Sequence, residues 1–178
     1  DKISNLKKYN GKFIKNKLAK PELAFSPTVC YHCFENLKNK KIYTNTVFNI
    51  KSACSRYESK NYKTFERLHV FTMREFVAYG SVNYIETFLE KNLNYFKRKF
   101  LDLDIKFRIV TASDPFFSDS GMKRMLYQNI NLLKKEFQFW LPNEKKWLAV
   151  GSFNNHLNSL SIKYKIKGKN NEFINSGC

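Results

Sequence analysis

Apolar and polar residues alternate along most of the chain, which is the pattern of β-strands that bury one face and expose the other. Two neighbouring runs of this kind are separated by polar residues and therefore predict an antiparallel pair joined by a loop. Similar runs follow in the second half of the chain. The predicted strands lie within residues 41–58, 63–80, 105–112, 132–142, 145–154 and 160–166.

One segment has the helical period instead. Gly80 ends the second strand pattern, Ser81 is a residue type that caps helices, and apolar residues then recur at helical spacing. These apolar residues are Ile85, Phe88, Leu89, Phe96 and Leu101. Because strands dominate, we expect an α+β fold in which this long helix packs against a mainly antiparallel sheet.

Length and composition set the domain organisation. The chain has 178 residues, 43% of them hydrophobic, which suffices for one core. We divide it into a basic, Asn-rich segment at 1–24 and a core at 25–178, with the apolar run 27–34 as an edge or connecting segment. No apolar run reaches the roughly 18 residues of a membrane span, and the first residues lack the apolar region of a signal peptide. We therefore expect a cytoplasmic protein.

The formal charge of +17 predicts attraction to acidic partners such as RNA, ATP phosphates or an acidic protein. The lysines are scattered through nearly every segment, together with many Asn, Ile, Tyr and Phe residues, which is also the mixture that an AT-rich genome encodes. The net charge alone therefore does not separate a nucleic-acid-binding protein from a protein of biased composition.

The second predicted strand carries more charge than most half-buried strands do. Period-two geometry places one set of its side chains on a common face: Arg67, His69, Phe71, Met73 and Glu75. One interpretation is a solvent-facing sheet with cross-strand ion pairs. The other is a phosphate-binding surface, because guanidinium groups beside a loop suit bidentate contacts with phosphate oxygens.

The residues around this strand resemble motif 2 of class II aminoacyl-tRNA synthetases, in which R-x-E is followed by a loop and then by (R/H)-x-x-x-F. Here the motif reads Arg56-x-Glu58, loop, Arg67-x-x-x-Phe71. Further segments resemble, in the same order, those of one branch, the seryl-tRNA-synthetase-like amino acid:[carrier protein] ligases. They read FTMREFVAYG, TASDPFF, QNINLLKKE, GSFNNH and SGC. The resemblance covers residues 25–178 and implies part of a class II synthetase-like sheet, mainly antiparallel and flanked by helices.

The resemblance implies an ATP site. Arg56 would contact the α-phosphate and Arg67 would lie over the phosphates, while Phe71 would stack on adenine and Glu58 would contact its side. These residue types suit those tasks, since guanidinium groups bind phosphate oxygens, rings stack on bases, and fixed donors stabilise charge that develops at the α-phosphate. Mg²⁺ is a further candidate cation, although the acidic residue that seryl-tRNA synthetases carry just before GSFNNH is not evident here.

The four cysteines allow two metal-site hypotheses. Cys30 and Cys33 form a C-x2-C pair, which two more ligands would complete to a closed structural zinc site. Candidates to complete it are His32, Cys54 and Cys178. The resemblance instead implies Zn²⁺ held by Cys30, Glu75 and Cys178, with one position open for the amino group of the substrate. Cys33 and Cys54 would then be core or bystander thiols.

The same resemblance implies an amino-acid pocket. Its members would be Asp114, Lys134, Glu136, Ser152 and Asn154. Asp114 would accept a hydrogen bond from the bound amine, although an aspartate before proline is also typical of a turn. Lys134 and Glu136 alternate on a predicted strand and would face the substrate, or else would lie on the protein surface.

Together these features predict an ATP-dependent ligase. It would activate a small amino acid, glycine or alanine, as the adenylate and transfer it to the phosphopantetheine thiol of an acidic carrier protein. The alternatives are a seryl-tRNA-synthetase-like core that acts on tRNA and a non-catalytic RNA-binding module.

The resemblance ends before motif 3, the G-x-G-x-x-R segment whose arginine holds the γ-phosphate in the family. This chain stops at Cys178 and also lacks the part that carries motif 1 and the dimer contacts. A degenerate relative and a fragment of a longer protein are both compatible with these ends. We expect a fragment of a homodimeric protein, and by itself the fragment would orient ATP poorly.

Overall fold

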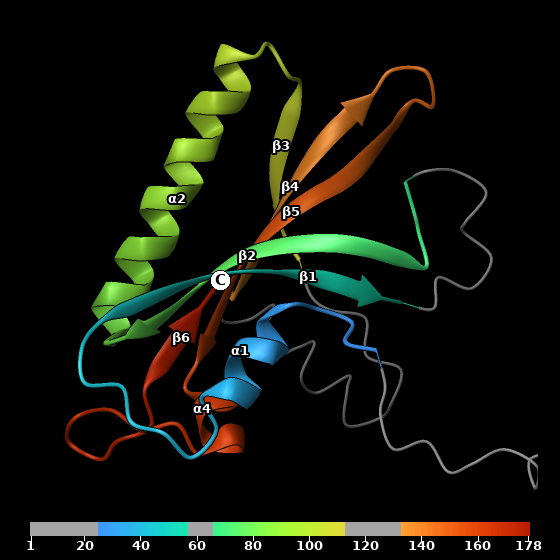
Figure 1. The fold of residues 1–178 in the computed structure, drawn as a ribbon. Coiled ribbons are helices and arrows are strands. Elements are labelled where there is room, and N and C mark those ends of the chain that lie inside the picture. The colour runs from blue at the N-terminus through green and yellow to red at the C-terminus, as the bar shows by residue number, and fades with distance from the viewer. Residues whose placement is uncertain (1–24, 57–65, 113–132) are drawn as a thin grey trace, which may run out of the picture.

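The computed structural model describes residues 25–56, 66–112 and 133–178 (Figure 1). Within these residues the strands form one six-stranded sheet in the order β1-β2-β6-β5-β4-β3, and every neighbouring pair is antiparallel. The strands are β1 (Thr46–Ser55), β2 (Val70–Gly80), β3 (Phe107–Thr111), β4 (Lys134–Leu141), β5 (Lys146–Leu157) and β6 (Asn175–Gly177). The helices are α1 (Cys30–Asn36), α2 (Val82–Asp102) and α4 (Ser159–Tyr164). The predicted α+β fold is confirmed.

The short strand β6 joins two parts of the sheet, the β1–β2 hairpin on one side and β3, β4 and β5 on the other (Figure 1). On one side Gly177 of β6 is opposite Ala78 of β2. On the other side β6 pairs with Asn155 and Leu157 of β5, where the register shifts. Since β6 is last in the sequence but lies in the middle of the sheet, the residue that follows it, Cys178, lies between the two parts.

Helix α2 covers one face of the sheet through aromatic contacts. The ring of Phe100 packs edge-to-face against Phe137 and Phe139, with centroid distances of 5.0 and 4.8 Å. Gly177 of β6 also faces α2, and a Cβ added there would lie 2.9 Å from Ile85 Cγ2. The close approach of β6 to α2 therefore requires glycine at this position. No helix in the described part of the chain is long and apolar enough to cross a membrane.

Helices α1 and α4 lie against the opposite face of the sheet (Figure 1). Phe34 of α1 contacts Tyr79 of β2 and Tyr164 of α4, with ring centroids 5.4 and 5.6 Å apart. The buried residues of this core are Cys30, Cys33, Phe34, Ile42, Val77, Tyr79, Ile166 and Ile174. Alternate residues of a strand share a face, so Glu75 of β2 lies on the same side as Tyr79.

The run 27–34 is not an edge or connecting segment throughout, because α1 begins at Cys30. A short apolar run fits either a strand or a buried helix. Cys30 and Phe34 are four residues apart and both are buried, so the helix brings them to one side, against the sheet.

The prediction of a strand at 160–166 is wrong, because most of this run belongs to α4. Its apolar residues are two apart, which suggested a strand, but Leu160 and Tyr164 are also four apart. Both pack against the core, whereas Ile162, between them, is 49% exposed. The helix ends at Tyr164, and its C-cap residue Lys165 has a left-handed backbone conformation (φ 55°).

The predicted start of the long helix is confirmed. Ser81 precedes α2, and its hydroxyl accepts a hydrogen bond from a backbone N–H of the first turn at 3.3 Å. Ile85 is fully buried, but Leu101 is 67% exposed, so its expected place on the packed face is wrong. The face toward the sheet carries Phe96 and Phe100, and the next residue is rotated by about 100° around the helix axis.

Candidate active site

The polar candidates on β4, β5 and β6 lie on one face of the sheet, the face opposite α2. The backbone of Cys178 exchanges two hydrogen bonds with that of Asn154, at 2.7 and 3.0 Å. Across the next pair of strands, Lys134 is opposite Asn154 and Glu136 is opposite Ser152. Residues that are directly opposite point to the same side of a sheet. The register therefore aligns these side chains in a row that leads to the Cys178 thiol.

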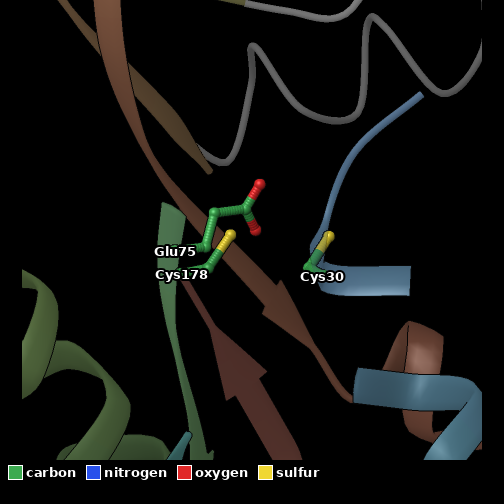
Figure 2. A group of neighbouring side chains, drawn as sticks. All are labelled: Cys30, Glu75 and Cys178. Atoms are coloured by element: carbon green, nitrogen blue, oxygen red, sulfur yellow. The ribbon is translucent and has the colours of Figure 1, made fainter. Parts of the chain in front are cut away.

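Three possible metal ligands converge at the end of this row. Cys30 Sγ, a carboxylate oxygen of Glu75 and Cys178 Sγ all lie within 4.8 Å of one another (Figure 2). They come from the first turn of α1, the middle of β2 and the residue after β6. Cys30 is buried and the other two are half-buried. Far-separated parts of the sequence thus meet at one point.

The electrostatics of this group favour a cation. Glu75 Oε1 accepts a hydrogen bond from the Thr28 hydroxyl at 2.8 Å, whereas Glu75 Oε2 is buried without a hydrogen-bond partner. A hydrogen bond with Cys30 and burial raise the pKa of the Cys178 thiol well above its usual range. Buried polar atoms normally have partners, and a bound cation would provide one for all three groups.

The donor set fits zinc. Two thiolates and a carboxylate are ligands that Zn²⁺ binds in a tetrahedral arrangement, and three protein ligands leave one position open. The hard cations Mg²⁺ and Ca²⁺ prefer oxygen donors and would not suit the two sulfurs. The residues present therefore meet the chemical requirement of a zinc site of the open kind.

The structure does not bring the alternative ligands of the C-x2-C hypothesis into this group. Cys33 and Cys54 are buried free thiols, and burial raises the pKa of each. Cys33 belongs to the apolar core beneath α1. His32, its neighbour on the helix, is exposed. A closed site built on Cys30 and Cys33 has no support in this geometry.

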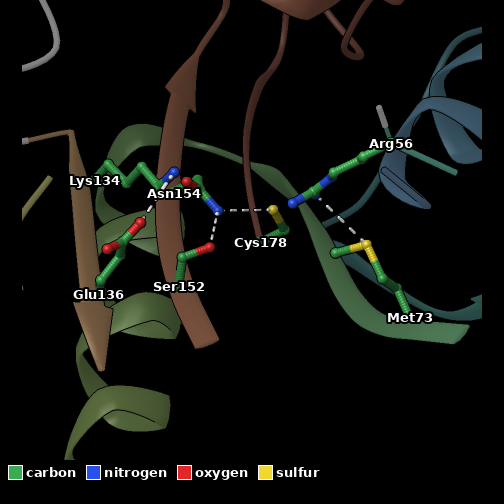
Figure 3. Close-up of polar contacts among 7 residues, drawn as sticks. All are labelled: Arg56, Met73, Lys134, Glu136, Ser152, Asn154 and Cys178. Atoms are coloured by element: carbon green, nitrogen blue, oxygen red, sulfur yellow. Dashed lines mark hydrogen bonds and ion pairs between the residues drawn. The ribbon is translucent and has the colours of Figure 1, made fainter. Parts of the chain in front are cut away.

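Arg56 lies next to the aromatic residue with which it would share the ATP site. Its guanidinium carbon is 5.2 Å from the centroid of the Phe71 ring. Its Nη2 is 3.8 Å from Met73 Sδ, the contact that Figure 3 shows. Arg56 Nε donates a hydrogen bond to the carbonyl oxygen of Pro27 at 2.7 Å. Arg56 is exposed, and a base that stacks on Phe71 would have to displace its guanidinium group from the ring.

The predicted amino-acid-binding residues form two pairs, one on β4 and one on β5, and the β5 pair also contacts the thiol. Lys134 Nζ is 3.4 Å from Glu136 Oε1, and their side chains are only 12% and 20% exposed, so the pair is not a surface ion pair. Asn154 Nδ2 donates to Ser152 Oγ at 3.1 Å and lies 3.5 Å from Cys178 Sγ (Figure 3). Polar groups thus continue from β4 to the possible metal ligands.

Three predicted site residues have no described place in this arrangement. Glu58 and Asp114 lie outside the described residues. Arg67 precedes the start of β2 at Val70 and is exposed, and the described contacts do not connect its guanidinium group to the others. The structure therefore leaves their predicted roles as predictions.

Two residues beside the ligands were not predicted. Thr28 donates to Glu75 and lies 3.6 Å from Cys30 Sγ, and no pattern in the sequence singles it out. His156 Nε2 lies 3.6 Å from Cys178 Sγ. Its position two residues after Asn154 on a strand was a usable signal, because it places both side chains on one face.

Comparison with known proteins identifies relatives in sequence and in fold. No family model matches the chain. The chain is 29% identical over 163 residues to amino acid–[acyl-carrier-protein] ligase 1 of Bradyrhizobium diazoefficiens, covering 90% of this chain and 49% of the ligase. It is 27% identical over 178 residues to the type-2 serine–tRNA ligase of Methanopyrus kandleri, covering 93% of this chain and 33% of that protein. The chain thus spans about half the length of the first relative and a third of the second.

Solved structures show the same fold. The M. kandleri seryl-tRNA synthetase, in complex with A. aeolicus tRNA(Sec), matches with a TM-score of 0.77 and 24% identity over 92% of this chain and 33% of its own. The Pyrococcus horikoshii seryl-tRNA synthetase, complexed with ATP, matches with a TM-score of 0.68 and 18% identity over 90% of this chain and 36% of its own. The chain is therefore similar in sequence to amino acid–carrier protein ligases and type-2 serine–tRNA ligases, and it has the fold of part of the class II seryl-tRNA synthetase core.

Proposed function

We propose that the chain is part of an ATP-dependent ligase that joins a small amino acid, glycine or alanine, to the phosphopantetheine thiol of a carrier protein. The proposal depends on one observation, the convergence of Cys30, Glu75 and Cys178 on the polar face of a seryl-tRNA-synthetase fold. The relatives from B. diazoefficiens are named as ligases of amino acids and acyl carrier protein. All four cysteines are free thiols, which suits a cytoplasmic location.

In this proposal Cys30, Glu75 and Cys178 hold Zn²⁺. When bound, the ion supplies a Lewis acid with an open position for the amine of a free amino acid, which favours an α-amino acid over other small acids. The surrounding side chains orient the ligands. Thr28 donates to Glu75, and Asn154 approaches Cys178 from β5.

The proposed reaction has two steps, formation of the adenylate and transfer to the carrier thiol. A carboxylate oxygen of the amino acid attacks the α-phosphorus of ATP, and pyrophosphate leaves. The carrier thiol then loses its proton to solvent, its sulfur attacks the carbonyl carbon, the bond from that carbon to the phosphate oxygen breaks, and AMP leaves as the thioester forms. In this scheme Arg56 moves from Phe71 to the α-phosphate and adenine takes its place on the ring, so the protein contributes positioning and charge stabilisation.

The test is pyrophosphate exchange into ATP by the full-length protein, measured with each small amino acid in turn. We expect exchange with glycine or alanine, and we expect Cys30→Ala to abolish both exchange and zinc content. Cys33→Ala is the matched control, because Cys33 is also a buried thiol of α1 but lies outside the ligand group, and it should retain both. Absence of exchange with every small amino acid would refute the enzymatic proposal.

A second acceptor is supported by the similarity to serine–tRNA ligases, one of which was solved with a tRNA. If tRNA is the acceptor, radiolabelled amino acid will appear in an RNase-sensitive product, whereas a thioester on the carrier protein will resist RNase. A non-catalytic RNA-binding role would instead give steeply salt-dependent RNA affinity without ATP binding. These three outcomes separate the candidate functions.

A further inference from the structure

His156 is a titratable residue beside the proposed metal ligands that the reaction scheme above does not use. Its Nε2 lies 3.6 Å from Cys178 Sγ, and its Nδ1 lies 3.3 Å from Ser176 Oγ. The donor atoms that all lie within 4.8 Å of one another belong to Cys30, Glu75 and Cys178 and do not include His156. The imidazole is therefore next to one ligand but outside the ligand group.

The neighbours of the ring determine which nitrogen carries the proton. A thiolate that binds a metal accepts hydrogen bonds and donates none, so the nitrogen next to Cys178 must be Nε2–H. In a neutral imidazole Nδ1 is then an acceptor, and the hydroxyl of Ser176 donates to it. Ser176 is fully buried, so the ring nitrogen provides the hydrogen-bond partner that its hydroxyl needs.

The fold also restrains the plane of the ring. Phe34 of α1 is fully buried, and its ring packs edge-to-face against the imidazole with centroids 5.7 Å apart. Asn154, two residues earlier on β5, approaches the same sulfur with Nδ2 at 3.5 Å. Two N–H groups from one strand thus surround Cys178 Sγ, and the remaining side of the sulfur faces Cys30 and Glu75.

We propose that His156 is a positioning residue for the metal-binding sulfur of Cys178: its Nε2–H donates to the thiolate, and the Ser176 hydroxyl holds the ring in that tautomer. The inference depends on the proposed zinc site. Its consequence is that the Cys178 thiolate is aimed at the ion and partly neutralised before the amino acid binds.

The experiment measures zinc affinity of the full-length protein by competition with a chromophoric chelator, and the sulfur-to-metal charge-transfer band after Co²⁺ substitution. His156→Phe keeps a ring against Phe34 but removes the donor, and we expect zinc affinity to fall by about 10–100-fold with a shifted band. His156→Gln places an amide N–H near the former Nε2 position and should restore most of the affinity.

Ser176→Ala tests the second contact. We expect a smaller loss of zinc affinity than in His156→Phe, and no further loss when the two substitutions are combined, because the serine acts only through the ring. Additive losses would contradict this coupling and overturn the proposed role of Ser176.

The outcomes separate this inference from the proposed function. Wild-type zinc affinity and an unchanged cobalt spectrum in His156→Phe would overturn the inference alone. A lowered melting temperature of the metal-free variant with unchanged zinc affinity would show a purely structural role and would also overturn it. X-ray absorption that reveals an imidazole nitrogen bound to the ion would overturn it in favour of a fourth ligand. A wild-type protein that binds no zinc would refute the proposed metal site and this inference together.

Discussion

Along β4 the two faces of the sheet have opposite chemistry, although the same strand builds both. On the α2 face, β4 presents Phe137 and Phe139, which pack edge-to-face with Phe100. On the other face the same strand presents Lys134 and Glu136, an ion pair that is largely shielded from solvent. Successive residues of one strand thus serve either the core or the candidate site.

The residues of β4 that pack in the core are thus separated from those that line the candidate site. Alternate side chains point to opposite sides of a strand, so the phenylalanines of β4 are buried against α2 without contacting the polar row on the other side. The polar face contains groups that are unfavourable without a partner, such as the buried Glu75 Oε2 and the Cys178 thiol with its raised pKa. Substitutions on the two faces should therefore have different effects.

A large effect on zinc affinity is expected from Glu75→Gln on the polar face. It keeps the shape of the side chain but removes its charge, and we expect zinc affinity to fall by at least about 100-fold, since changes outside the ligand set alone cost about 10–100-fold. The unfolding free energy of the metal-free protein should not decrease, because a buried carboxylate is removed. Zinc content by mass spectrometry and urea unfolding measure the two quantities; a variant with full zinc content would contradict the ligand assignment.

Phe137→Ala is the corresponding change on the aromatic face. Phe137 is 2% exposed, and its truncation should lower the unfolding free energy by about 3–5 kcal/mol. The protein that remains folded should bind zinc as the wild type does. Leu101→Ala is the control, because Leu101 is 67% exposed and its loss should change stability by no more than about 0.5 kcal/mol.

Gly177→Ala should lower both the stability of the fold and the zinc affinity, because β6 contacts α2 and leads directly to Cys178. The added methyl would lie 2.9 Å from Ile85 Cγ2 and 3.0 Å from the carbonyl oxygen of Asn154, so β6 must shift. We expect a loss of about 1–3 kcal/mol in unfolding free energy. Zinc affinity should fall as well, since Cys178 follows directly. A loss of stability with unchanged zinc affinity would show that the position of Cys178 does not depend on the α2 contact.

The smallest effect is expected at the start of α2. Ser81→Ala removes the N-cap acceptor and should lower the unfolding free energy by about 1 kcal/mol, whereas Ser81→Gly should cost only a few tenths. Zinc affinity should be the same in both variants, because the cap lies on the α2 side. A marked change in zinc affinity would contradict the independence of the two faces.

The sequence by itself determined the elements whose pattern is long and local. The strands β1 to β5 and the start of α2 follow from alternation, helical spacing and Ser81. The short helices α1 and α4 were not predicted, because six or seven apolar and polar residues fit both periods. Packing against the sheet selects the helix in these runs, and that contact is absent from the local sequence.

The motif resemblance also named the candidate ligands, but their meeting was decided by the tertiary structure. Cys30, Glu75 and Cys178 are far apart in the chain, and they converge because the last strand enters between β2 and β5. The contacts of Thr28 and His156 with the ligands likewise depend on that insertion. Local periodicity records which side of a strand a residue faces, whereas the position of one strand among the others depends on pairing between distant segments.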